Sequence, residues 1–387
     1  MYNKIDKRLL SKINILSNEK CVDVIVKTIE GKSCIDVLKK YSCSDIEYFS
    51  IINAYSFKTK YKNLFDIASK QFVKYVSGEC RVCGLVYNSK KTINFDYINA
   101  PISRHTCVVI DTGVYPHIDF CLGRNRIIKF IDLINQNKYF YDDNGHGTFI
   151  TGILSSNSFI SINSGIDNSC DIIVIKALDK DGETASSVVL SAMQWILENM
   201  LKFNIRVVCM SFGSDVVDGY DPLVNGAEVL WDNGIVVVTA GGNSGPEPET
   251  IMSPGASRKV ITVGSMRVDN GVYSVADFSS RGPVFGNVKP DLVVPGVDLV
   301  STNVFSFDKQ FYTTMSGTSV SAPIVAGVAS KLISINPNYT PNQIKYMILN
   351  SCVPINCDKN SEGYGRLDLS KLRLIWKIAL LWQCNFF

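Results

Sequence analysis

The sequence lacks the features that mark several classes of protein. It contains no basic run, no acidic tail and no low-complexity tract, and its net charge is only +3 over 387 residues. This near balance gives no reason to expect nucleic acid or a membrane surface as a partner. What is present is a globular composition, 46% hydrophobic with 27 glycines, in a chain long enough for one large domain and a smaller unit.

The first residues show no recognisable export signal. Met1 to Leu10 is positively charged, but no apolar run of sufficient length follows it. We therefore expect a cytoplasmic protein whose twelve cysteines are mostly free, buried thiols. Cys80 and Cys83 form one CxxC pair without the second pair or nearby histidines that a zinc site needs. No metal site is predicted, and metal or redox use of this pair stays an alternative.

The N-terminal part of the chain predicts a small mixed unit. After an extension over residues 1–19, residues 20–79 have the pattern strand, helix, strand, helix and strand, at 22–27, 34–41, 46–57, 64–70 and 72–76. This order suits a small α+β sheet of the ferredoxin-like kind. The polar, irregular residues 80–100 then predict a linker.

The pattern changes after the linker and favours a large α/β domain over residues 101–370. Short apolar runs alternate with longer stretches of helical spacing. The runs are Thr106–Ile110, Ile172–Ala177, Arg206–Met210, Gly234–Thr239 and Val260–Val263, and the helices are Thr184–Met200 and Pro222–Asp232. Runs without polar alternation indicate strands buried on both faces. We therefore predict a doubly wound, mainly parallel sheet with helices on both faces.

The last residues, 371–387, form an apolar tail that Arg373 and Lys377 interrupt. The tail is too short and too charged to predict a membrane span. We expect it to pack on the large domain as a final helix. Peripheral membrane contact, which we do not expect, and a partner surface are the alternatives.

A histidine between two glycines is the first candidate for chemistry. Only three histidines occur in the chain, and His105 and His117 lie in segments without catalytic features. His146 lies in Asp142-Asp-Asn-Gly-His-Gly-Thr, ahead of an apolar stretch that predicts a buried helix. A serine nucleophile needs such a firmly held base to take its proton, and a third group to hold the base.

Asp111 is the candidate for that third group. It ends the apolar run that starts at Cys107, and the carboxyl ends of parallel strands are where sites form in such sheets. A carboxylate there is costly unless it is paired, and an imidazole N–H is a suitable partner. Asp111-Thr-Gly also matches the tripeptide of aspartic proteases, which need two copies. This chain has one, so that class is only an alternative.

Ser319 is the candidate nucleophile. The segment Met315-Ser-Gly-Thr-Ser-Val-Ser-Ala-Pro runs into an apolar helix, which would place Ser319 at the helix N-terminus. Free N–H groups and the helix dipole there favour the negative charge that develops during attack on a carbonyl. We expect Pro323 to fall in the first turn, where its missing N–H has no helical partner. For Ser319 alone, a structural helix cap is the alternative, and the segment is not a G-x-S-x-G elbow.

Asn243 is the candidate for stabilising the charge on the substrate. It follows the apolar run Gly234-Ile-Val-Val-Val-Thr-Ala, so its side-chain amide would lie at a strand end. Together with the backbone N–H of Ser319, that amide can donate to an oxyanion. The neighbouring glycines could suggest a phosphate loop, but neither a Gly-Lys-Ser/Thr sequence nor a Rossmann spacing is present.

These four segments together resemble the subtilisin (S8) family of serine proteases. The match in residue type, order and separation covers Asp111-Thr-Gly, Asn144-Gly-His-Gly-Thr, Gly242-Asn-Ser-Gly and Gly317-Thr-Ser-Val-Ser-Ala-Pro, and runs from about Val108 to Leu369. The stretches that begin at Lys176, Arg206 and Phe278 are most similar to the intracellular bacterial group of that family.

The resemblance implies a serine endopeptidase with Asp111, His146 and Ser319 as its catalytic triad and Asn243 in the oxyanion hole. It implies protein or peptide substrates that bind as an extended strand. Six residues would form the walls of the first specificity pocket, namely Ser211, Phe212 and Gly213 on one side and Ala240, Gly241 and Gly242 on the other. No cofactor is expected for the chemistry.

The resemblance also implies that residues 20–79 are an inhibitory, fold-assisting propeptide that is cut between Gly78 and Lys91. A retained accessory domain is the alternative. Relatives often bind structural calcium, but Ser155–Asp167 shows no ligand pattern, so no calcium residue is assigned. Phe149 stands where the family usually has a second histidine. A catalytically silent, peptide-binding member and a protease that cuts only itself are the other interpretations.

Overall fold

The computed structural model describes residues 4–5, 9–10, 19–29, 34–49, 53–78, 92–94, 105–122, 124–157, 165–216, 221–305 and 310–372. The chain forms two compact units, Met1–Cys83 and Gly84–Phe387, which we describe separately. The predicted cleavage region, the CxxC pair and the tail from Arg373 onward lie outside the described residues.

The described part of the N-terminal unit contains a four-stranded antiparallel sheet and short helices. Its elements in chain order are β1 (Cys21–Thr28), α2 (Ile35–Leu38), β2 (Glu47–Phe49), β3 (Ala54–Lys60), α3 (Leu64–Ser69) and β4 (Val73–Gly78), and the strand order is β2-β3-β1-β4. This is the βαββαβ arrangement of a ferredoxin-like sheet. The one strand predicted over 46–57 is in fact two strands, because the chain turns at Asn53, which has a positive φ of 48°.

Part of the predicted N-terminal extension belongs to this unit. Ile5 is buried and forms a β-bridge with Val76, and Leu9 is buried in the same apolar cluster as Val24 and Phe57. The physical reason for the difference is that isolated apolar side chains can complete a small core without forming a long element.

The larger unit is built on one mainly parallel sheet. The strand order is β15-β16-β12-β10-β9-β8-β5-β7-β6, with β11 paired to β10. The bounds are β5 (Thr106–Asp111), β6 (Ile127–Asp132), β7 (Asp171–Lys176), β8 (Ile205–Met210), β9 (Val236–Ala240), β10 (Ile261–Asp269), β11 (Val272–Val275), β12 (Leu292–Pro295), β15 (Cys352–Val353) and β16 (Arg366–Leu367). The central strands are buried on both faces, as their β-branched composition predicts.

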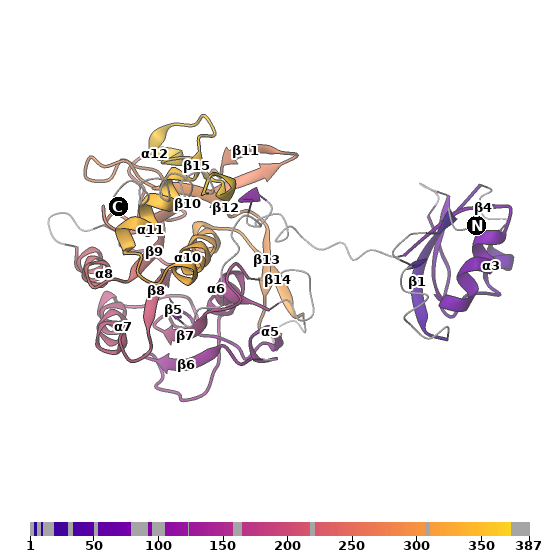
Figure 1. The fold of residues 1–387 in the computed structure, drawn as a ribbon, viewed down its shortest axis with the longest axis horizontal. Coiled ribbons are helices and arrows are strands. Elements are labelled where there is room, and N and C mark those ends of the chain that lie inside the picture. Colours follow the sequence, from indigo (N-terminus) through magenta and orange to yellow (C-terminus); the bar gives the residue numbers. More distant parts are fainter. Residues whose placement is uncertain are drawn as a thin grey trace, which may run out of the picture. The chain divides into compact units, whose positions relative to one another are not determined.

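Helices cover both faces of this sheet, which confirms the predicted doubly wound architecture. Helices α7 (Ser186–Asn199) and α8 (Pro222–Asp232) lie on one face, and α6 (His146–Ser155) and α10 (Thr318–Ile335) lie on the other (Figure 1). The hairpin of β13 (Leu299–Thr302) and β14 (Tyr312–Met315) leads into α10, and helix α11 (Pro341–Asn350) follows α10. In the described chain, α10 alone has the length and apolarity of a membrane span, and 83% of it is buried in the core.

The ends of the larger core differ from the predicted domain bounds. Ile93, in the predicted linker, is fully buried, and its carbonyl accepts a hydrogen bond from the backbone N–H of Leu369. Leu372, in the predicted tail, is 3% exposed in the same core. Both residues belong to the apolar core of the larger unit, and local patterns do not reveal such packing between distant segments.

Candidate active site

Asp111 is the last residue of β5, which lies between β7 and β8 in the middle of the sheet. Its carboxylate is fully buried. Oδ1 accepts hydrogen bonds from His146 Nδ1 at 2.7 Å and from the backbone N–H of Thr112 at 2.8 Å, whereas Oδ2 has no hydrogen-bond partner in the described chain. Because Nδ1 is bound to Asp111, the other ring nitrogen of His146, Nε2, is the one that can take a proton from a nucleophile.

His146 begins helix α6, and the glycines beside it are needed for its placement. Gly145 has a φ of 102°, a left-handed conformation that favours glycine. A Cβ on Gly147 would lie 2.2 Å from the carbonyl oxygen of Gly113 and 3.1 Å from Asp111 Cβ. The first turn of α6 therefore rests directly on the end of β5, which sets the distance between the imidazole and Asp111.

The environment of His146 strengthens it as a base. Burial lowers the pKa of the imidazole, but the carboxylate of Asp111 and, more weakly, that of Asp142 outweigh burial, so the pKa of His146 is raised above its ordinary value. A quarter of the His146 side chain remains exposed, which leaves the ring accessible from the surface.

Asp142 organises the loop before His146, a role that the sequence analysis missed. Its Oδ1 accepts hydrogen bonds from Thr112 Oγ1 at 2.9 Å and from the Gly145 N–H at 2.8 Å. Its Oδ2 accepts from the N–H and the hydroxyl of Thr148, at 2.8 and 2.6 Å. This one buried carboxylate joins the end of β5 to the start of α6. The signal in the sequence was the acidic residue four positions before the histidine.

Ser319 is the second residue of α10 and is partly exposed. At this position the backbone N–H has no intrahelical acceptor, so it can donate to a substrate. The prediction that Pro323 lies in the first turn is wrong, because α10 begins at Thr318 and Pro323 is inside the helix. An N–H at position 323 would bond the carbonyl of Ser319, and that carbonyl instead accepts a hydrogen bond from Ser211 Oγ at 2.9 Å.

Asn243 lies just beyond β9 and its amide is turned toward Ser319. Its Oδ1 accepts hydrogen bonds from the backbone N–H and the hydroxyl of Thr318, at 2.8 and 3.0 Å. These bonds occupy the oxygen and leave Nδ2 as the amide atom on the side of Ser319 Oγ. A Cβ on Gly317 would lie 3.0 Å from Ser319 Oγ and 3.2 Å from Asn243 Nδ2. The hydroxyl and the amide nitrogen therefore border one small volume, as a nucleophile and an oxyanion donor must.

The structure thus joins the predicted residues as two pairs, Asp111 with His146 and Ser319 with Asn243. Helix α6, which begins with His146, packs against α10, which carries Ser319 in its first turn (Figure 1). Phe149, in place of the expected second histidine, is fully buried, and its carbonyl accepts a hydrogen bond from Ser301 Oγ at 2.8 Å. It therefore has a packing role beneath the site.

The residues predicted as pocket walls follow neighbouring strands, with Ser211, Phe212 and Gly213 after β8 and Ala240, Gly241 and Gly242 at the end of β9. Met252, which the sequence analysis missed, touches both groups. A Cβ on Gly213 would lie 2.7 Å from Met252 Cβ, and one on Gly242 would lie 2.6 Å from its Cγ. The pocket assignment stays a prediction.

No group of three or more His, Cys, Asp or Glu side chains that could hold a metal ion occurs among the described residues. Part of the loop named for calcium, residues 158–164, lies outside them. The nine cysteines of the described chain are free thiols, four of them buried.

These contacts bring a serine, a histidine, an aspartate and an asparagine to the carboxyl edge of a doubly wound α/β sheet, the residue types of a serine-protease site. The chain belongs to the subtilase family, peptidase S8, whose model matches residues 105–365. It is 39% identical to serine protease AprX of Bacillus subtilis (strain 168) over 269 residues, which cover 63% of this chain and 60% of AprX. It is 30% identical to subtilisin DY of Bacillus licheniformis over 67% of this chain and 86% of that protein.

Solved structures agree with this assignment. A cold-adapted subtilisin-like serine proteinase superposes with a TM-score of 0.57 and 27% identity over 70% of this chain and 91% of its own. The S41 psychrophilic protease superposes with a TM-score of 0.62 and 26% identity, over 73% of this chain and 97% of that protease. The chain spans 46% to 60% of the length of several curated relatives, AprX among them.

Proposed function

We propose that the protein is a serine endopeptidase that hydrolyses peptide bonds through an acyl-enzyme formed on Ser319. The observation that carries this proposal is the 2.7 Å hydrogen bond between Asp111 and His146, in the family whose relatives are named as serine proteases. The amide of Asn243, oriented by Thr318 beside Ser319 Oγ, adds the second component of such a site.

The proposed chemistry uses only groups of this chain. Ser319 Oγ attacks the scissile carbonyl carbon while His146 Nε2 takes the hydroxyl proton, and the imidazolium then gives that proton to the departing amine. Asp111 stabilises the imidazolium, and Asn243 Nδ2 and the Ser319 N–H donate to the oxyanion. A water molecule repeats the sequence on the acyl-enzyme and releases the second product. No cofactor takes part in these steps.

Substrates are proposed to be protein or peptide segments in extended conformation. The backbone at Ser211, Phe212 and Gly213 would pair with the substrate, and Ala240, Gly241 and Gly242 would form the facing wall of the pocket. Recognition through backbone hydrogen bonds tolerates many side chains, so broad cleavage is expected.

The N-terminal unit is proposed to be a propeptide that the enzyme removes itself, and the setting is proposed to be the cytoplasm. The separate core of residues 1–83 supports the first proposal, and the free thiols of the described cysteines suit the second. Structural calcium stays open to a binding test on the purified protein.

The proposal is tested by comparing wild type with Ser319→Ala on casein. Wild type should release peptides, and the variant should release none. A wild type that binds peptides without cleaving them would contradict the proposal and favour the silent interpretation. Sequencing the N-termini of both proteins tests self-cleavage between Gly78 and Lys91, and cleavage of the N-terminal unit without casein hydrolysis would indicate a protease limited to itself.

A further inference from the structure

Lys176 is a fully buried cation beside the strand that carries the triad aspartate. It is the last residue of β7, and in the parallel pairing of β5 with β7 it lies in register with Asp111. A buried ammonium group is costly unless its N–H groups are satisfied and an anion balances its charge. Its contacts therefore show what the protein gains by placing it there.

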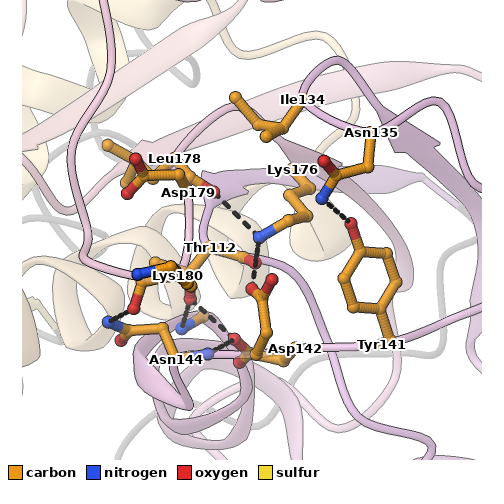
Figure 2. A network of polar contacts seen from close by, with 12 residues as sticks. Thr112, Ile134, Asn135, Tyr141, Asp142, Asn144, Lys176, Leu178, Asp179 and Lys180 are labelled. Carbon is orange, nitrogen blue, oxygen red and sulfur yellow. Dashed lines mark hydrogen bonds and ion pairs between the residues drawn. The ribbon is translucent and has the colours of Figure 1, made fainter.

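The ammonium group uses all three of its N–H donors. Lys176 Nζ donates to the carbonyl oxygens of Thr112 at 2.6 Å and Leu178 at 3.0 Å, and to Asp143 Oδ1 at 2.6 Å. It also lies 5.2 Å from the centre of the Tyr141 ring. Figure 2 shows the lysine reaching between the strand end at Thr112 and the segment that contains Tyr141 and Asp142.

Two of these partners, Thr112 and Asp143, belong to the two segments that carry the Asp111–His146 pair. Thr112 directly follows Asp111, and Asp143 lies three residues before His146. The neighbouring carboxylate of Asp142 is occupied by N–H and hydroxyl donors from Thr112, Gly145 and Thr148. Lys176 forms an ion pair with Asp143, whose side chain is 35% exposed.

We propose that Lys176 and Asp143 are positioning residues of the active site. Their ion pair holds the segment before His146 against the end of β5 and so keeps the imidazole within hydrogen-bond distance of Asp111. Neither residue touches the reacting atoms. This inference rests on the proposed peptidase function and adds to it the device that sets the geometry of the base.

The test compares peptide hydrolysis by wild type, Lys176→Met, Asp143→Ala and the double variant. Each single change should lower kcat about tenfold with little change in KM, less than the roughly 100-fold that a 1 Å misplacement can cause. Because the two residues act through one contact, the double variant should lose no more than the worse single variant. Losses that multiply would overturn the proposal.

The pH profile separates positioning from a direct charge effect. Asp111 and Asp142 are the charges that raise the pKa of His146, so an imidazole displaced from Asp111 has a lower pKa. Both single variants should therefore shift the acid limb of kcat/KM to lower pH. The direct field would act oppositely for the lysine, because loss of a cation favours the protonated imidazole. A shift to higher pH in Lys176→Met would overturn the proposal.

Matched variants control for stability. Lys289 is another buried lysine, 2.7 Å from Asp291 and remote from the triad contacts, so Lys289→Met should lower Tm without moving kcat or the acid limb. An equal shift in Lys289→Met would overturn the proposal. Asp143→Asn keeps an acceptor oxygen and should retain more activity than Asp143→Ala. Should Lys176→Met not fold, the partly exposed Asp143 variants decide the question.

The same measurements separate a failure of the proposed peptidase function from a failure of the positioning role. If wild type itself does not hydrolyse peptides, the proposed function fails. If wild type is active and Asp143→Ala keeps the kcat and acid limb of wild type, the proposed function stands and the positioning role is wrong.

Discussion

At the scale of single residues, two side chains of the candidate site are oriented by hydrogen bonds that fix which of their polar atoms stays available. Asp111 binds His146 through Nδ1, and Thr318 binds Asn243 through Oδ1. In each case the opposite atom, Nε2 or Nδ2, is the one to which we assign a chemical role. Both orientations follow from contacts between segments far apart in the chain.

The raised pKa of His146 predicts the acid limb of activity. Hydrolysis needs the neutral imidazole, whose fraction grows as the pH rises through the pKa of His146, so kcat/KM should reach half its plateau above pH 6.5, the ordinary histidine value. Asp111→Asn removes the charge that raises this pKa, so the limb should move to lower pH. In the same variant kcat should fall about 10⁴-fold, as loss of the orienting carboxylate does elsewhere. A pH–rate profile of both proteins measures this, and an unchanged limb in Asp111→Asn would contradict it.

The amide of Asn243 should act in the transition state alone. Asn243→Ala should lower kcat about 10²- to 10³-fold, or roughly 3–4 kcal/mol, with little effect on KM. Steady-state kinetics on a peptide anilide measures the two constants separately. Thr318→Val is the companion variant. It keeps the backbone N–H that binds Oδ1 but removes the Thr318 hydroxyl, which donates to Oδ1 at 3.0 Å and accepts from the Gly242 N–H at 3.1 Å. Its loss in kcat should therefore be smaller than that of Asn243→Ala. A rise in KM without a fall in kcat would contradict this role.

At the scale of elements, helix α10 carries both a partly exposed serine in its first turn and a proline inside the helix. Its first turn leaves Ser319 partly exposed, while Pro323 interrupts its hydrogen bonds one turn later. Ser211, at the end of β8, supplies the missing donor to the Ser319 carbonyl. The helix start is thereby tied to the strand that is proposed to pair with substrate.

This compensation predicts a specific coupling in stability. Ser211→Ala leaves the carbonyl of Ser319 without its donor and should lower the free energy of unfolding by about 1–3 kcal/mol. In a Pro323→Ala background the restored N–H can bond that carbonyl, so the same change should be less destabilising. Urea unfolding of the four proteins measures the coupling.

A hydroxyl on the same helix provides the control for that cycle. Ser334 Oγ is buried without a hydrogen-bond partner in the described chain, so Ser334→Ala should be nearly neutral or stabilising. Additive effects of Ser211→Ala and Pro323→Ala would contradict the compensation.

The sequence predicted elements best where one residue property decides the structure. The runs at β5, β7 and β8 are buried on both faces, so their uninterrupted apolar composition identifies them. Strand β6 was not predicted, because it lies at the edge of the sheet and carries exposed residues such as Lys129. The break between β2 and β3 was missed because it depends on one positive φ at Asn53.

At the scale of the whole molecule, a buried polar network joins the sheet to α10 far along that helix from Ser319. His105 Nε2 lies 2.7 Å from Ser330 Oγ, which donates to Asp167 Oδ2 at 2.5 Å, and Asp167 pairs with Lys331 at 3.1 Å. His105, Asp167 and Ser330 lie on three different segments of the larger unit, and Lys331 follows Ser330 on α10. Burial lowers the pKa of His105 to about 4.

This network predicts how stability depends on pH. Between pH 6.5 and about 4, His105 is protonated in the unfolded chain and neutral in the folded one, so its contribution is present above pH 6.5 and is lost as the pH falls. At about 1.4 kcal/mol per pH unit, a fall from pH 6.5 to 5 should remove about 2 kcal/mol. Chemical unfolding at both pH values measures this. His105→Gln should flatten the dependence by that amount, and an unchanged slope would contradict the assignment.

The Asp111–His146 contact and the place of Asn243 beside Ser319 could be predicted because glycines, strand ends and helix starts mark these residues in the sequence. The role of Lys176 could not be predicted, because a lysine at a strand end is usually solvated, and only the structure reveals its burial beside Thr112. Asp142 and Met252 were missed for the same reason. Their roles come from what they touch, and those contacts join segments separated along the chain.

The central claim is that Ser319, activated by His146, is the nucleophile. Its most direct test is to treat the full chain with a fluorophosphonate, measure the intact mass and map the modified peptide. We predict that wild type carries one adduct, on Ser319. The adduct should be absent in Ser319→Ala and should form much more slowly in His146→Ala. An adduct at another residue, or equal labelling of Ser319→Ala, would contradict it.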